Sequence, residues 1–132
     1  MKSALWSLQV SIFNRLKNDS VLKSRAKVFD SVSESTSLPY VVIGEDTVVP
    51  FGTKLEDGEE ITHTLYVYSS YNGRKEVKEL MSLVLESITR EPLSLEGGFS
   101  VFASSLDLMQ VTDVNDSPVK RGVMRFRFKI TQ

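Results

Sequence analysis

The segment from residue 66 to residue 88 reads YVYSSYNGRKEVKELMSLVLESI, and its hydrophobic period changes in the middle. Up to Ser69 apolar and polar residues alternate, which is typical of a strand with one buried face. After Gly73, apolar residues recur at helical spacing: Val77, Leu80, Met81, Val84, Leu85 and Ile88. The segment therefore predicts a strand that leads into an amphipathic helix wide enough to cover a sheet. Asn72 is the expected N-cap of that helix.

The rest of the chain predicts further elements on both sides of this segment. Leu5 to Leu16 has the spacing of a helix, and a short helical turn follows near Val21, with Asp19 or Ser20 as its cap. Strands are expected at residues 28–29, 40–43, 61–69, 99–109 and 119–130. The order α-β-β-β-α-β-β predicts an α+β fold. We expect a single domain over residues 1–132, with two main helices packed on a mixed or antiparallel sheet of four to five strands.

The last strand combines an apolar face with a cationic one. Its expected core residues alternate with basic residues that face away: Arg121, Arg125, Arg127 and Lys129. Three interpretations remain open for this basic strand: a sheet edge protected by charge, an interface with a neighbouring subunit, or the lining of a channel through which DNA passes.

Residues 45 to 60 have the opposite charge, with six acids and one lysine. Pro50, Gly52 and Gly58 predict an irregular loop here, long enough to need a functional explanation. Val48, Val49 and Phe51 are apolar residues among these acids. Either they fold back over the core, or they become buried when a partner docks.

Residues with catalytic potential are scarce in the sequence. His63 is the single histidine, sits in mid-strand and is expected to be structural; cysteine is absent. Gly73-Arg74-Lys75 at a helix start would suit a phosphate, but charges on a helix surface explain it equally well. We expect no enzyme activity, no metal site and no cofactor.

The net charge of −1 gives the whole molecule no electrostatic attraction to nucleic acid or to an anionic membrane. The N-terminal residues lack the pattern of a signal peptide, and no apolar run is long enough to span a bilayer. We therefore expect synthesis in a cytoplasm and no membrane partner. A small DNA-binding domain is the alternative, using the basic strand and the basic N-terminal region, Arg15, Lys17, Lys23, Arg25 and Lys27.

Several segments together resemble the tail-completion proteins of long-tailed bacteriophages. They are LPYVVIGEDT at residues 38–47, YNGRKEV at 71–77, Leu93-Ser94-Leu95, and RGVMRFRF at 121–128. The helical start near Leu8 to Leu16 agrees as well, so the resemblance covers nearly the whole chain in the expected order. The chain is most similar to the tail-to-head joining proteins of siphophages that infect Gram-positive bacteria.

This resemblance implies a structural virion protein that caps the head-proximal end of the tail tube, ends tail polymerisation and joins the tail to the head connector. The implied partners are the tail tube protein and the head-completion (stopper or connector) protein. The implied assembly is a homo-hexameric ring through which DNA passes without sequence-specific binding, built from a chain that is a monomer in solution. The implied location is the host cytoplasm during assembly and then the head-tail junction of the virion.

A ring built head to tail needs two different complementary patches on each subunit. The acidic segment and the basic strand are the candidates for these patches. The expected interface residues are Val48, Val49, Phe51, Lys54, Glu56, Asp57, Glu59, Arg121, Arg125, Arg127 and Lys129.

Overall fold

A computed structural model describes residues 1–52 and 57–132 of the chain. The elements follow the predicted order: α1 (Leu5–Lys17), α2 (Ser20–Lys23), β1 (Lys27–Phe29), β2 (Tyr40–Gly52), β3 (Asp57–Ser69), α3 (Lys75–Thr89), β4 (Ser100–Asp113) and β5 (Lys120–Thr131). The predicted α+β class is confirmed. In the part of the chain that the structure describes, no helix is long and apolar enough to cross a membrane.

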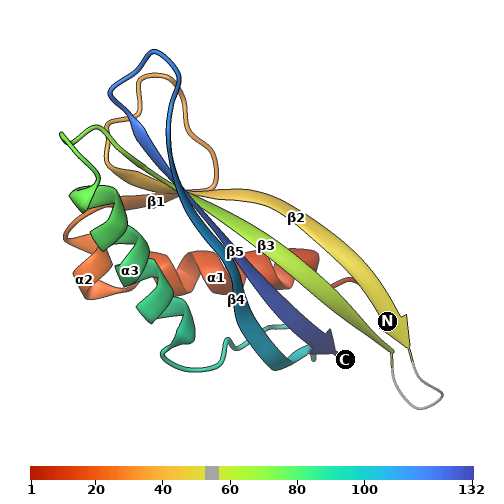
Figure 1. Cartoon of the computed structure of the whole chain (residues 1–132). Coiled ribbons are helices and arrows are strands. Elements are labelled where there is room, and N and C mark those ends of the chain that lie inside the picture. Colours follow the sequence, from red (N-terminus) through yellow and green to blue (C-terminus); the bar gives the residue numbers. More distant parts are fainter. Residues whose placement is uncertain (53–56) are drawn as a thin grey trace.

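The five strands form one mixed sheet in the order β1-β2-β3-β5-β4. β1 pairs parallel with β2, and all other neighbours are antiparallel. The apolar side chains of α1 and α3 join one buried cluster with alternate residues of the central strands, including Ile61, Leu65, Met124 and Phe126. Because these strand residues share one face of the sheet, both helices cover that face and leave the other one bare (Figure 1). We call the uncovered side the bare face.

The strand-to-helix passage follows the predicted pattern except at the helix start. All members of the predicted stripe are buried or packed against the core. Asn72 is not the N-cap: α3 begins at Lys75, and Arg74 holds the N-cap position without a side-chain cap bond. Gly73, at φ 79°, carries the chain through a left-handed turn that moves the helix start downstream. The Ser69 hydroxyl instead donates to Glu76 at 2.6 Å and ties the strand end to the first helical turn.

The prediction of a loop at residues 45–60 is wrong. β2 continues to Gly52 and β3 begins at Asp57, so the two strands form a long hairpin, and we call its outer part, residues 44–52 and 57–62, the arm (Figure 1). A bulge between Ile43 and Asp46 separates the arm from the rest of β2. Pro50 does not break the strand because nothing in the described chain pairs with this outer side of β2, where a missing amide proton is tolerated.

β4 and β5 form the expected antiparallel hairpin. β4 continues four residues beyond the predicted end, to Asp113, whereas β5 has the predicted length and lies one residue further along the chain. The side chains expected in the core, Met124, Phe126, Phe128 and Ile130, are all buried. β5 lies between β3 and β4, however, so the edge strands of the sheet are β1 and β4. The interpretation of the basic strand as a charge-protected edge is therefore wrong.

Candidate assembly surfaces

The arm divides its apolar residues between the two faces of the sheet. Val48 packs against the core, as the fold-back interpretation expects. Val49 points to the bare face and is 62% exposed. Phe51 lies over Gly58 and meets Phe102 of β4 edge to face, with ring centroids 6.0 Å apart. Only part of the predicted apolar set is thus available to a partner.

The acids of the arm are partly engaged within the chain. Glu59 accepts hydrogen bonds from the Ala4 amide at 2.7 Å and from the Ser3 hydroxyl at 3.2 Å, and so anchors the start of α1 to the arm. Asp57 is largely exposed, 4.0 Å from the N-terminal ammonium group. Lys54 and Glu56 lie outside the described residues. Of the described acids in the predicted interface, Asp57 is the one that remains accessible.

The basic strand lies beside acids of its own sheet. The Arg127 guanidinium reaches Glu60 of β3 at 3.1 Å and Asp107 of β4 at 2.8 Å. The arm and the basic strand are therefore linked within one chain through β3. This placement neutralises Arg127 and reduces the charge that the strand offers to another molecule.

The other basic residues of β5 differ in accessibility. Arg125 and Lys129 are exposed on the bare face and form no ion pair within the described ranges. Arg121 is half-buried, and its Nε finds no hydrogen-bond partner there. Arg125 and Lys129 are thus the basic residues of β5 best placed to meet a partner.

Glu45 lies near Arg125 on the bare face. Its carboxylate accepts a hydrogen bond from the Tyr66 hydroxyl, at 2.7 Å to one oxygen and 2.8 Å to the other. This bond holds the pKa of Glu45 below its usual value and raises the pKa of Tyr66. The charge of Arg125 lowers the pKa of Glu45 to a smaller extent. The bare face is therefore a mixed polar surface with charges of both signs.

Two arginines of the N-terminal basic region also have partners within the chain. Arg15 donates to the backbone carbonyls of Ser87, Glu91 and Pro92, at 2.9 to 3.1 Å, and joins α1 to the end of α3. Arg25 pairs with Glu79 of α3 at 2.9 Å. These contacts give both arginines structural roles and weaken the interpretation of the region as a nucleic-acid surface.

At the possible phosphate site of residues 73–75, the arginine is also bound to a carboxylate of its own chain. Arg74 binds the Asp113 carboxylate, at 2.9 and 3.0 Å, and Lys120 approaches the same carboxylate at 3.1 Å. The pKa of Asp113 is lowered, mainly through its bond to Lys120. This turn therefore joins α3 to the β4–β5 hairpin.

His63 lies on the covered face at the inner end of the arm. Its ring is fully buried, and Nδ1 bonds to Asp46 at 2.5 Å across the β2–β3 pair, next to the bulge. Nε2 has no hydrogen-bond partner among the described residues. The burial of the ring supports the structural interpretation of this histidine.

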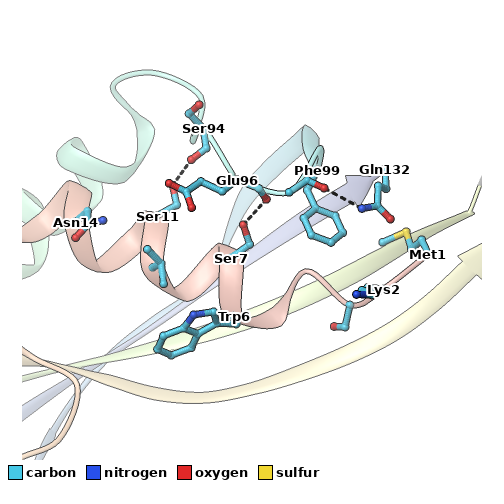
Figure 2. A pocket seen from close by; sticks show the side chains of 13 residues that line it. Met1, Lys2, Trp6, Ser7, Ser11, Asn14, Ser94, Glu96, Phe99 and Gln132 are labelled. Atoms are coloured by element: carbon cyan, nitrogen blue, oxygen red, sulfur yellow. Dashed lines mark hydrogen bonds between the residues drawn. The ribbon is translucent and has the colours of Figure 1, made fainter.

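Sequence reasoning did not single out a groove beside α1. The groove has a volume of about 990 Å³ and lies between α1 and the segment that leads from α3 to β4 (Figure 2). Ser7 and Ser11 join the two sides of the groove by donating to the carbonyls of Glu96 and Ser94, at 2.7 and 2.9 Å. Trp6 lines the groove and is 69% exposed. Its position outside the buried stripe of Leu8, Ile12 and Leu16 is the sequence signal that could have identified it.

Comparisons with known proteins agree with the resemblance in the sequence. The family described as "Tail completion protein gp17" matches residues 10–131. The tail completion protein gp17 of Bacillus phage SPP1 is 38% identical over 104 residues, which cover 79% of this chain and 76% of the relative.

Solved structures agree with the fold. The structure of bacteriophage SPP1 gp17 superposes with a TM-score of 0.69 at 34% identity, covering 96% of this chain and 91% of that one. A chain of the native gene transfer agent (GTA) virion shares the fold at a TM-score of 0.88 and 18% identity, over the full length of both chains. With the family match, these likenesses show that the chain belongs to the gp17 family of bacteriophage tail completion proteins, structural components of the phage tail.

Proposed function

We propose that this tail completion protein caps the head-proximal end of the tail tube, ends tail polymerisation and joins the tail to the head connector. The observation that carries the proposal is the family match over residues 10–131, on a chain whose sheet has one face without helices (Figure 1). A sheet face without helices suits a protein that acts by contact with neighbours. The partners would be the tail tube protein and the head-completion protein.

The proposed assembled form is a homo-hexameric ring through which DNA passes without sequence-specific binding. The chain would be a monomer in the host cytoplasm and would join the virion at the head-tail junction. The net charge of −1 is compatible with such a passage, because a chain without excess positive charge would not hold the phosphate backbone strongly.

The proposed contact residues of this ring are those members of the expected set that are exposed. Val49 and Asp57 of the arm and Arg125 and Lys129 of β5 are exposed, whereas Val48 and Glu59 have partners within the chain. We propose that the exposed members contact neighbouring proteins, and that Arg127 mainly stabilises the sheet through Glu60 and Asp107.

The deciding experiment is complementation of a phage that lacks this gene, with electron microscopy of the products. Without the protein, we expect filled heads beside unattached tails of irregular length, and the wild-type gene should restore joined particles. Finding tails of normal length that still join heads in the mutant would contradict the proposed function.

Charge reversal tests the contact surface within the same assay. The variant Arg125→Glu with Lys129→Glu should reduce the yield of joined particles, since both cations lie on the bare face away from ion pairs in the described chain. The matched control is Lys23→Glu with Lys27→Glu, which reverses two exposed cations near α2 and β1. Equal yields from the two variants would remove the basic strand from the interface.

A further inference from the structure

We propose that neighbouring copies of this chain join edge to edge, with the outer edge of β4 in one copy pairing antiparallel with the arm segment of β2 in the next. The inference rests on the ring of the proposed function and specifies the contact between its subunits. Edge pairing of this kind uses main-chain hydrogen bonds for affinity and side chains for specificity.

The sheet has two different unpaired edges. β4 pairs with β5 on one side and with no described strand on the other. β1 covers β2 only from Tyr40 to Val42, which leaves the outer side of residues 44–52 without a described partner. An unpaired edge presents a row of backbone donors and acceptors that another strand can satisfy.

The exposed apolar residues on these two edges lie at the same level of the sheet. Val49 is opposite Glu60, Glu60 is opposite Lys129, and Lys129 is opposite Ala103, next to Phe102 in the β4 bulge. Val49 is 62% exposed and Phe102 is 55% exposed. The Phe102 ring also meets Phe51 of its own chain, so that only its exposed part is available to a neighbour. A copy placed edge to edge at the same height would bring that exposed part against Val49 of the next copy and bury both.

The strand directions suit such a contact. β2 and β5 run opposite to β3, and β4 runs opposite to β5, so β4 and β2 have opposite directions within one sheet. Rotation about an axis roughly along the strands preserves these directions. β4 of one copy would then meet β2 of the next as an antiparallel pair, and two different edges joined by rotation generate a ring.

Both edges also have features that limit pairing with unrelated strands. β4 has bulges between Val101 and Ala103 and between Leu106 and Leu108. β2 has Pro50, which offers no amide proton, and a bulge at the inner end of the arm. Such irregularities protect an exposed edge from indiscriminate association. The proposed ladder is consequently short, and the contact of Phe102 with Val49 supplies much of its specificity.

Disulfide cross-linking tests the pairing directly, because the native chain has no cysteine. The double variant Val49→Cys with Phe102→Cys would replace the wild-type gene in the phage, and oxidised particles would be examined by non-reducing electrophoresis. Facing residues of antiparallel strands have Cα atoms about 4.5 to 5.5 Å apart, within the range that a disulfide spans. In a single chain the two positions are three strand spacings, about 14 Å, apart and cannot bond.

The expected result is a ladder of covalent multimers. The matched control, Val49→Cys with Lys78→Cys, places the second thiol on the exposed side of α3 and should give no ladder. Joined particles that contain the Val49→Cys, Phe102→Cys chain but yield only monomers would overturn the edge pairing and leave the proposed function intact. Tails without the protein at their head-proximal end would contradict the proposed function itself.

A second test, with an introduced pair of opposite charges, applies if the cysteine variant fails to assemble. Phe102→Glu should lower the yield of joined particles about tenfold or more, because the contact would bury an unpaired carboxylate. Adding Val49→Lys in the same chain should restore most of the yield by pairing the two charges between neighbours. Normal yields from Phe102→Glu alone, or no recovery in the double variant while the purified chain stays folded, would overturn the proposal.

Discussion

At the scale of single residues, Asp19 makes part of the stability of the fold depend on pH. Its carboxylate accepts hydrogen bonds from the backbone amides of Val21 and Leu22, at 3.1 and 3.0 Å, and caps α2. Asp19 is thus the cap, of the two residues that the sequence offered for this position. The Leu22 amide is the main cause of the lowered pKa of this carboxyl, and the charge of Arg90 contributes. Because the folded-state pKa lies below the unfolded one, the stabilisation is complete above about pH 4 and is lost as pH falls through the folded pKa.

We therefore expect Asp19→Ala to lower the free energy of unfolding by about 1 kcal/mol at pH 7. Asp19→Asn, which keeps a capping oxygen, should lose less. The difference between wild type and Asp19→Asn should shrink when urea unfolding is repeated at pH 3. A difference that is independent of pH would show that the charge of Asp19 does not contribute.

Gly58 gives a second prediction at this scale, because the Phe51 ring occupies the space above it. A Cβ at Gly58 would overlap that ring and lie 2.9 Å from the Ile130 carbonyl oxygen. Gly58→Ala should lower the free energy of unfolding by about 1 to 3 kcal/mol through overpacking. The control is Gly52→Ala, whose nearest described neighbour is the carboxylate of Asp57 at 3.2 Å. Thermal unfolding of the two variants makes the comparison, and equal melting temperatures would contradict it.

At the scale of elements, α3 is one of the two helices that cover the sheet, and its buried stripe packs directly on the strands. Leu80 is fully buried within its stripe, whereas Lys78 on the same helix is exposed. Leu80→Ala should lower the free energy of unfolding by about 2 to 5 kcal/mol, because it leaves a cavity against the sheet. Lys78→Ala should change it by less than about 0.5 kcal/mol. Denaturant unfolding measures both, and a small effect at Leu80 would mean that the sheet closes over the vacated space.

The elements also show what the sequence could and could not reveal. The α3 stripe and the alternation in β5 were readable because each depends on residues near one another in the chain. The arm was not readable from the sequence, because proline and glycine usually interrupt strands. Here both are accommodated within a strand: Pro50 lies on an unpaired edge, and Gly58 makes room for Phe51.

The candidate site was predictable only in part, for a related reason. Arg127 looked free in the sequence, yet strand order places it between Glu60 and Asp107, which are distant in the chain. Phe102 was not selected, since its importance depends on β4 being an edge strand. Pairing between remote segments is not encoded in a local pattern, so charge and apolar content alone did not identify the accessible residues.

At the scale of the whole molecule, the charge distribution predicts weak affinity for DNA. The net charge is −1, and Arg15, Arg25 and Arg127 bind groups of their own chain. We expect the purified chain to show no strong binding to duplex DNA at low salt, measured by fluorescence anisotropy. Arg125→Glu with Lys129→Glu serves as the reference for residual electrostatic attraction. Tight binding that falls steeply with added salt would instead support the DNA-binding alternative.

The long register of β3 with both of its neighbours has a mechanical consequence. β3 pairs with β5 continuously from Gly58 to Ser69, and with β2 along most of its length. Antiparallel hydrogen bonds lie perpendicular to the strands, so tension along the strands loads many of them in shear at once. A pull directed sideways at β4 would instead unzip its pairs one after another. The protein should therefore resist stretching along the strand axis far better than peeling at its outer edge.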